Sequence, residues 1–415
     1  MKTAILTVGT EILFGQIVNT NAAFLSQQLN NLGYDVMYHY TVGDNPGRLA
    51  ELIHLAFRDC DLILTTGGLG PTQDDLTKET IAKAMGDVVV ENPACMKYLK
   101  ENYERAGRKM TPNNLKQAYM PSRATVLPND AGTAPGFALE QDGKIIIAMP
   151  GPPREMQRMF ELQVKPLLQK KQDSVIYYRM LRMFGIGESS LETVLLPLID
   201  GQTDPTLATY AKEGECSLRI ASKRATEEEA RAAVDEMTEK VRSLVGDYIY
   251  SYDDEDLIDV VGRLLLEKKI TIACAESCTG GLFAGALTDT SGISEVFGHG
   301  YVTYSCEAKE TELGVKPETI ETYGVVSPQV AEEMAAGLAA KTGAKLCISV
   351  TGLAGPDGGS PEKPVGLAYI GVSYEGRLYA VKSYYRNVSR KWNRHYTLLR
   401  MLFEVYRLIS PENPA

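Results

Sequence analysis

Short apolar runs alternate with amphipathic segments in the first part of the chain, residues 1–170. Asn21–Leu32 and Arg48–Phe57 repeat apolar residues at helical spacing. Before and after these helical segments, short apolar runs have the length and composition of buried strands, at Thr3–Val8, Asp61–Thr66 and Lys144–Met149. Strands that alternate with helices predict a parallel α/β sheet, in which ligands bind where the strands end in loops.

The middle of the chain, residues 171–252, has another order of elements. The pattern predicts helices at Gly187–Pro197 and Thr226–Val245. It predicts strands at Val175–Phe184, Leu207–Tyr210, Ser217–Ser222 and Asp247–Tyr250. Thr226 and Glu229 form a capping box at the start of the second helix. The order β-α-β-β-α-β indicates a small α+β module. Its residues suggest no catalytic site, so we interpret it as a spacer or dimerisation module.

The last part, residues 253–415, follows the acidic link Asp253–Asp256, which indicates a flexible connection between domains. A helix is expected after Ser327 and a long one from about Ser389. An earlier, short helix is expected at Leu282–Leu287. Strands are expected at Ile270–Ala275, Lys345–Val350, Val365–Ser373 and Leu378–Tyr384. This part is again α/β, and the whole chain is an α/β multidomain protein.

Composition narrows the class of protein. A chain of 415 residues with 44% hydrophobic and 23% charged residues is typical of a soluble protein with two or three domains. The net charge of −10, without a long basic run, argues against a nucleic-acid partner. No apolar run reaches the roughly 20 residues that cross a bilayer. The seven cysteines form no CxxC pair, so we expect reduced thiols and a cytoplasmic protein.

The segment around Ser277 carries the most specific chemistry. A predicted strand ends at this serine, and a turn of small residues leads into a helix. The backbone amides of Cys278, Thr279, Gly280 and Gly281 would then face an oxyanion.

No histidine lies nearby to activate Ser277, which suggests Ser-Lys amide hydrolysis. Lys309 could act as base if burial lowers its pKa, and Tyr304 could relay the proton between them. The residue types alone rather favour the alternative, in which Ser277 caps a helix, Tyr304 packs on a strand and Lys309 is solvated.

A second candidate site follows the strand Asp61–Thr66. Gly67, Gly68 and Gly70 would let the backbone turn tightly around an anion. Asp74 and Asp75 then offer hard oxygen ligands for a divalent ion such as Mg²⁺. The alternative is that both carboxylates only stabilise a helix N-terminus. Neither a Rossmann nor a P-loop motif is present.

Several motifs resemble, in order and over nearly the whole chain, the CinA family of competence/damage-inducible proteins: Gly9–Leu13, Gly68–Thr77, Gly132–Gly136, Met149–Met156, Ala275–Gly281, Val302–Ser305, Glu307–Lys309, Gly324–Ser327, Thr351–Pro356 and Lys363–Gly366. The resemblance implies a molybdopterin-binding-like N-terminal domain with metal-dependent ADP-ribose pyrophosphatase activity. Mg, Mn or Co would bind at Asp74 and Asp75, with K⁺ as a further candidate. The resemblance places Gly67, Gly68 and Thr72 around the diphosphate and Glu11 at the same sheet edge.

The C-terminal motifs are similar to nicotinamide-mononucleotide deamidase, which needs no cofactor. The resemblance implies Ser277 as nucleophile, Lys309 as base and Tyr304 as relay. Thr351, Gly352 and Gly355 would lie along the substrate, and Arg390 and Arg394 match family arginines that face it.

The leading hypothesis is a cytoplasmic, bifunctional pyridine-nucleotide salvage enzyme. It would hydrolyse nicotinamide mononucleotide and ADP-ribose, as a homodimer without a nucleic-acid or membrane partner. One alternative is a regulatory protein that binds a nucleotide or molybdopterin with little catalysis, linked to competence or DNA damage. A third hypothesis, an enzyme that handles molybdopterin, leaves the other domains without a role.

Overall fold

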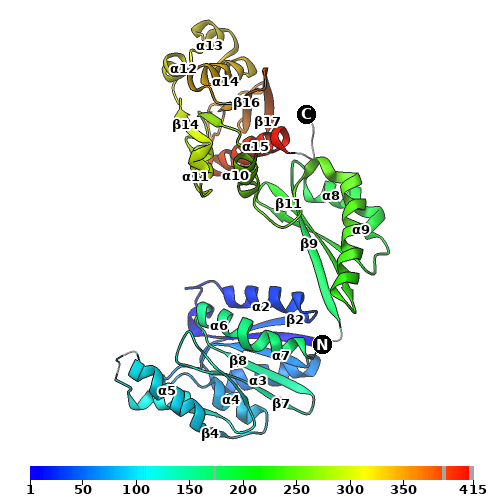
Figure 1. Cartoon of the computed structure of the whole chain (residues 1–415), viewed down its shortest axis with the longest axis vertical. Helices are drawn as coiled ribbons and strands as arrows, with labels where there is room; N and C mark the ends of the chain where they lie inside the picture. Colours follow the sequence, from blue (N-terminus) through cyan, green and yellow to red (C-terminus); the bar gives the residue numbers. More distant parts are fainter. Residues whose placement is uncertain (106, 108, 172–173, 386–388, 411–415) are drawn as a thin grey trace. The chain divides into compact units, whose positions relative to one another are not determined.

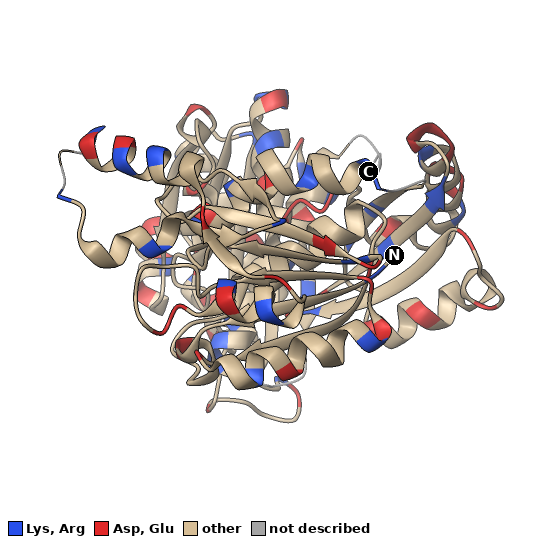
Figure 2. Cartoon of the chain, turned by 90° about the horizontal axis from the view of Figure 1, so that it is seen from below, with Lys and Arg blue, Asp and Glu red and all other residues tan. Residues whose placement is uncertain are grey.

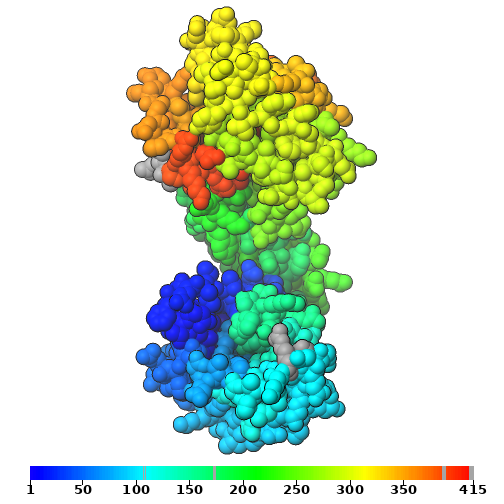
Figure 3. Space-filling view, turned by 90° about the vertical axis from the view of Figure 1, so that its left-hand side faces the viewer, coloured from blue at the N-terminus to red at the C-terminus, as the bar shows by residue number. Residues whose placement is uncertain are grey.

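The computed structural model divides the chain into two compact units (Figure 1). One comprises Met1–Tyr177 and Ser222–Ala232, and the other comprises Tyr178–Ala221 and Ala233–Ala415. Most of the middle module is therefore grouped with the C-terminal domain. The residues of the N-terminal domain, coloured from blue through cyan to blue-green, form one continuous body (Figure 3). The structure describes residues 1–105, 107, 109–171, 174–385 and 389–410.

The N-terminal domain is built on a six-stranded sheet of order β2-β1-β3-β8-β7-β6. Its strands are β1 (Lys2–Val8), β2 (Asp35–Val42), β3 (Leu62–Thr66), β6 (Thr125–Leu127), β7 (Gly136–Gln141) and β8 (Lys144–Met149). Strands β2, β1, β3 and β8 are parallel, but β7 runs antiparallel to β8 and β6. The three strands predicted from the sequence, β1, β3 and β8, are parallel as expected, and the antiparallel strands β6 and β7 were not predicted. A tight turn at Asp142 and Gly143, which both have positive φ, joins β7 to β8 as a hairpin.

Helices cover both faces of this sheet (Figure 1). One face carries α2 (Thr20–Asn31), α6 (Pro153–Met159), the π-helical turn η2 (Phe160–Val164) and α7 (Lys165–Gln169). The other carries α3 (Pro46–Asp59), α4 (Thr77–Ala84) and α5 (Pro93–Arg105). Smaller elements are α1 (Thr10–Leu13), the 3-10 helix η1 (Pro112–Ala118) and the antiparallel pair β4 (Val89–Glu91) and β5 (Tyr119–Pro121). The domain is an α/β sandwich with the loop after β3 at one sheet edge.

The middle module has a four-stranded sheet of order β10-β11-β9-β12. Its elements are β9 (Val175–Phe184), α8 (Glu188–Ile199), β10 (Thr206–Lys212), β11 (Glu215–Arg224), α9 (Glu227–Val245), η3 (Gly246–Tyr248) and β12 (Ile249–Ser251). The element order is the predicted one, and Thr226 Oγ1 accepts the Glu229 amide at 3.3 Å. The last strand begins later than predicted because Gly246–Tyr248 forms a 3-10 turn.

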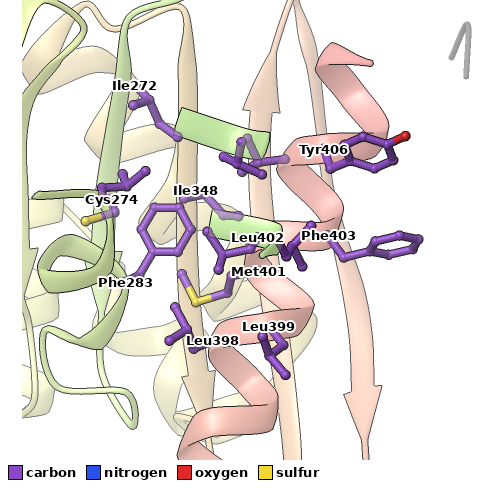
Figure 4. Close-up of a cluster of buried hydrophobic side chains, with 14 of the residues drawn as sticks. Ile272, Cys274, Phe283, Ile348, Leu398, Leu399, Met401, Leu402, Phe403 and Tyr406 are labelled. Carbon is purple, nitrogen blue, oxygen red and sulfur yellow. The ribbon is translucent and has the colours of Figure 1, made fainter. Parts of the chain in front are cut away.

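The C-terminal domain has a mixed sheet of order β14-β13-β15-β16-β17. Its strands are β13 (Ile272–Glu276), β14 (Phe297–Val302), β15 (Leu346–Gly352), β16 (Leu367–Tyr374) and β17 (Arg377–Tyr384). One face packs against α10 (Leu257–Lys268), α11 (Leu282–Thr288), η4 (Ile293–Glu295) and α15 (Arg390–Ile409). The other packs against α12 (Cys306–Leu313), α13 (Pro317–Tyr323) and α14 (Pro328–Thr342). Phe283, Met401 and Leu402 lie beside Ile348 in the core under α15 (Figure 4).

The acidic link Asp253–Asp256 is fixed to the middle module. The Arg182 guanidinium, only 2% exposed, lies 3.5 Å from Asp254 and pairs with Asp256. The Asp254 amide donates to Met180 O at 3.1 Å. A flexible connection at this point was therefore the wrong prediction, because the acidic side chains have a buried cationic partner that the local sequence does not reveal.

Basic and acidic residues are interspersed along the helices, as the colours in Figure 2 show. Within the described parts of the chain, no helix has the length and apolarity needed to cross a membrane.

Candidate functional site

Ser277 lies directly after β13, which pairs with β14 on one side and β15 on the other. Its side chain is 9% exposed, and its Oγ is 3.1 Å from Nζ of Lys309. Lys309 is completely buried on α12, a helix whose N-cap Ser305 accepts the Ala308 amide at 3.0 Å. Exposed Cys306 begins this helix. The strand end and the helix thus bring together two side chains that are 32 positions apart in the sequence.

The burial of Lys309 makes its amine easier to deprotonate than that of an exposed lysine. Burial lowers the pKa of Lys309 from its ordinary value, and no described carboxylate forms an ion pair with it. Its Nζ also lies 2.7 Å from Thr303 O, 3.4 Å from Tyr304 O and 3.5 Å from Ser305 O. In the neutral amine, two N–H groups can be donated to these carbonyls while the lone pair faces the Ser277 hydroxyl. This is the arrangement that a general base needs.

Tyr304 does not lie between Ser277 and Lys309, because these two residues are in direct contact. The phenol is 58% exposed, and its Oη accepts from Arg390 Nη2 at 2.8 Å. The geometry therefore links Tyr304 to Arg390, and the predicted relay position between Ser277 and Lys309 is not occupied by the phenol.

The turn after Ser277 uses two of its four predicted oxyanion donors internally. The Gly280 amide donates to Ser277 O at 3.1 Å, and the Gly281 amide to Glu276 Oε2 at 3.0 Å. Both glycines have positive φ, which lets the chain turn tightly here. The amides of Cys278 and Thr279 remain as the candidates for an oxyanion hole.

Glu276 is a functional residue that the sequence did not single out. Its carboxylate is completely buried and accepts the amides of Gly281, Phe283 and Ala284 at 2.9–3.1 Å. The carboxylate thus satisfies the free N–H groups at the start of α11 and fixes the Ser277 turn. The signal in the sequence is an acidic residue just before a small-residue turn and a helix.

Both predicted arginines reach loops around Ser277 from α15. Arg394 donates to Cys278 O at 3.1 Å and to Thr279 O at 2.6 Å. Arg390 donates to Gly355 O at 2.7 Å as well as to Tyr304. The structure therefore places both side chains at the Ser277 region, on protein acceptors.

The predicted substrate loop after β15 is held by close packing. Thr351 Oγ1 donates to Val325 O at 2.8 Å. A Cβ on Gly355 would lie 2.4 Å from Val365, and one on Gly352 would lie 2.7 Å from the Ala368 side chain. Gly355 is joined to Tyr304 through Arg390, which donates to both residues.

The loop after β3 in the N-terminal domain has the tight turn that was predicted. Gly67 and Gly68 have positive φ, and a Cβ on Gly67 would lie 2.0 Å from Val8 O. Thr72 donates from its amide to Asp75 Oδ2 at 2.9 Å and from its hydroxyl to the same oxygen. The exposed Asp74 has a lowered pKa because of hydrogen bonding to Thr72 and to its own backbone.

Two lysines that the sequence analysis did not consider hold this loop. Lys116 Nζ donates to Thr72 O at 3.1 Å and to Asp75 O. Buried Lys78 donates to Lys116 O at 2.6 Å, and burial lowers its pKa to about 8. The loop thus carries cationic groups beside its carboxylates, which suits an anionic ligand.

Glu11 lies apart from the carboxylates of this loop. It lines a cavity of about 50 Å³ with Asn21, Thr66 and Gly151, whereas Asp74 and Asp75 do not line this cavity. Asn21 donates to Thr66 Oγ1 and Gly151 O at 3.0 and 2.7 Å. The described residues contain no group of three or more His, Cys, Asp or Glu side chains arranged to hold a metal ion.

Known families match each part of the chain. Residues 4–170 match the model "Probable molybdopterin binding domain", residues 178–251 the model "Damage-inducible protein CinA KH domain", and residues 254–409 the model "CinA C-terminal domain". The chain is 49% identical to a relative from Clostridium kluyveri named competence-damage inducible protein, over 91% of this chain and 92% of the relative. A relative of the same name from Acetivibrio thermocellus is 48% identical over 90% and 91%.

A solved structure titled competence/damage inducible protein CihA, from Agrobacterium tumefaciens, is 39% identical. It covers 36% of this chain and 93% of its own, with a TM-score of 0.35.

The fold therefore defines a multidomain α/β protein with a molybdopterin-binding-like N-terminal domain. The family matches and the two relatives, which align over nearly their full length, also identify the family of the chain. The chain belongs to the CinA family of competence/damage-inducible proteins.

Proposed function

We propose that the C-terminal domain is a serine amidohydrolase that converts nicotinamide mononucleotide to nicotinate mononucleotide and ammonia. The observation that carries the proposal is the 3.1 Å contact between Ser277 Oγ and the buried Lys309 Nζ. A lysine without a carboxylate partner among the described residues, beside a serine at a strand end, suits a nucleophile and its base. The substrate identity rests on the family resemblance.

The reaction proceeds by two acyl transfers. Ser277 Oγ attacks the carboxamide carbon, and its proton passes to Lys309 Nζ. The Cys278 and Thr279 amides stabilise the oxyanion. The tetrahedral intermediate collapses when the Lys309 ammonium gives its proton to the leaving nitrogen, which departs as ammonia. Water then attacks the acyl-enzyme, Lys309 takes its proton, and Ser277 regains that proton as nicotinate is released.

The test is ammonia release from nicotinamide mononucleotide by the full chain in the presence of a metal chelator. Wild type should turn over, whereas Ser277→Ala and Lys309→Ala should lose at least about a thousandfold in kcat. Hydroxylamine should trap the acyl group from wild type only. Full activity in Ser277→Ala would refute the proposal. Glu295→Gln, a change of an exposed side chain on η4, is the matched control.

For the N-terminal domain we propose hydrolysis of ADP-ribose to AMP and ribose 5-phosphate. The supporting observation is the loop that combines Gly67 and Gly68 at positive φ with two carboxylates and Lys116. The Asp75 carboxylate lies over Gly70, where a Cβ would be 2.5 Å from Oδ2. Thr72 contacts Oδ2, which leaves Oδ1 for a cation. Two carboxylates fit an ion that completes its shell with water and phosphate oxygens.

Asp74 and Asp75 would hold this divalent ion, which would neutralise diphosphate charge and polarise water. Gly67, Gly68 and Thr72 would contact the diphosphate, and Lys116 orients the loop. AMP formation from ADP-ribose should require Mg²⁺, Mn²⁺ or Co²⁺ and should be lost in Asp75→Asn. Calorimetric binding of ADP-ribose or molybdopterin without AMP formation would instead favour the regulatory or molybdopterin-handling hypotheses.

A further inference from the structure

Arg394 is bound to the turn that carries the proposed oxyanion donors. Its Nε and Nη2 donate to the consecutive carbonyls of Cys278 and Thr279 at 3.1 and 2.6 Å. The side chain comes from α15, 115 or more positions away in the sequence, and is half-buried. One guanidinium therefore fixes two successive peptide groups next to Ser277.

Because a trans peptide is planar, fixing a carbonyl oxygen also fixes the direction of the N–H group of the next residue. The carbonyl and the following N–H of a planar trans peptide point in opposite directions. The peptide bonds of this turn are not among the cis bonds of the chain. Holding Cys278 O therefore sets the direction of the Thr279 N–H. Holding Thr279 O sets the Gly280 N–H, which donates to Ser277 O.

The other amides of the turn have different restraints. The Gly281 amide is held by Glu276 at 3.0 Å, and the Gly280 amide closes the turn onto Ser277. The Thr279 amide lies beside the Cys278 sulfur, which is a weak acceptor, and the carbonyl that precedes this amide is held by Arg394. Arg394 thus orients the peptide group that carries one of the two candidate oxyanion donors beside the nucleophile.

We propose that Arg394 is a positioning residue for the oxyanion hole rather than a ligand of the substrate's phosphate. The inference rests on the proposed amidohydrolase function of the Ser277 site. Arg390 differs because it is exposed and binds one carbonyl and the hydroxyl of one exposed side chain, Tyr304. Of the two arginines, Arg390 is the one whose donors can turn to an anionic ligand without releasing the turn after Ser277.

Two measurements on Arg394→Met and Arg394→Lys separate the roles. One is kcat for ammonia release from nicotinamide mononucleotide, and the other is the Kd of nicotinate mononucleotide by calorimetry. A positioning role predicts that kcat falls about 10- to 100-fold, because a misplaced oxyanion donor acts only on the transition state. The Kd of the phosphate-bearing product should stay within about twofold.

The proposal is overturned if the Kd weakens tenfold or more, or if kcat stays within twofold of wild type. If Arg394→Met does not fold, Arg394→Lys carries the test, because an ammonium cannot hold both carbonyls in the same geometry. Arg407→Met, at the exposed far end of the same helix, should keep both parameters. Absence of ammonia release by wild type would instead contradict the proposed function itself.

Discussion

The ionisation of Lys309 should control the pH dependence of the C-terminal site. Only the neutral amine can accept the Ser277 proton, so kcat/KM should rise with pH and level off once Lys309 is deprotonated. Burial lowers the pKa of Lys309, so the rise should end below the value of about 10.4 expected for a free lysine. A pH–rate profile of ammonia release measures this directly.

Lys309→Arg is the matched variant for this profile. A guanidinium stays protonated at every accessible pH, so this variant should be inactive throughout. A wild-type profile without an acidic limb would argue that Lys309 is not the base.

Replacing Glu276 by glutamine should destabilise the C-terminal domain. The carboxylate accepts three backbone amides, and a glutamine amide would turn N–H groups toward some of them. Burying unmatched donors costs about 1–3 kcal/mol, so the thermal unfolding midpoint should drop. The turn after Ser277 should also loosen, with a lower kcat. Glu295→Gln should change neither quantity, and equal midpoints for both variants would contradict this role.

The sequence predicted the pairing of Ser277 and Lys309 but not the position of Tyr304. The roles of the serine and the lysine came from the family resemblance, since the residue types and their spacing alone left the pairing open. The Tyr304 hydroxyl binds Arg390, which is more than eighty positions away in the sequence, and local spacing does not predict such a contact. Glu276 escaped notice because a carboxylate at a strand end is normally solvated, and only the folded turn shows that it is buried.

At the scale of elements, the packing of α14 against the end of α12 depends on Gly337. A Cβ at this position would lie 1.7 Å from Leu313 O. Alanine favours a helix over glycine by up to about 1 kcal/mol, but overpacking costs about 1–3 kcal/mol. Gly337→Ala should therefore lower the unfolding midpoint of the protein.

The control lies on α11, where a Cβ on Gly285 would meet nothing within 4 Å. Gly285→Ala should keep or raise the midpoint, since propensity alone acts there. If both alanine variants stabilise the protein, the two helices are not in the close contact described.

The predicted strands and helices lie close to those of the structure because each has a clear apolar period. The antiparallel edge of the first sheet was missed, although Asp142-Gly143 is a known hairpin signal. Strand direction depends on which strands pair across the domain, and a pattern of apolar residues along the chain does not contain that information.

At the scale of the whole molecule, Arg182 joins the middle module to the acidic link of the C-terminal domain. Besides Asp254 and Asp256, its Nε lies 3.3 Å from the Tyr250 hydroxyl, which in turn donates to Glu215. Arg182→Met should lower the free energy of unfolding by about 1.5–3 kcal/mol, because it removes charged hydrogen bonds from a buried network.

Arg242→Met is the surface control, since its pair with Glu239 is about half exposed and worth at most about 1 kcal/mol. Urea unfolding of both variants would measure the difference. Equal losses would mean that the middle module does not depend on Arg182.

The order of the domains was readable from motif order, but their grouping was not. From the local sequence, Arg182 is predicted to be an ordinary polar residue in a strand, and Asp253–Asp256 is predicted to be a solvated linker. Their pairing needs a contact across more than seventy positions, which no local pattern encodes.

Cys306 gives the protein a built-in reporter position. Six of the seven cysteines are buried, and Cys306 alone is exposed, one helical turn before Lys309. A single maleimide dye would therefore attach beside the proposed amidase site of the unaltered chain. Its fluorescence would follow ligand arrival at this site in real time, and the same thiol makes the domain open to covalent, cysteine-directed inhibitors.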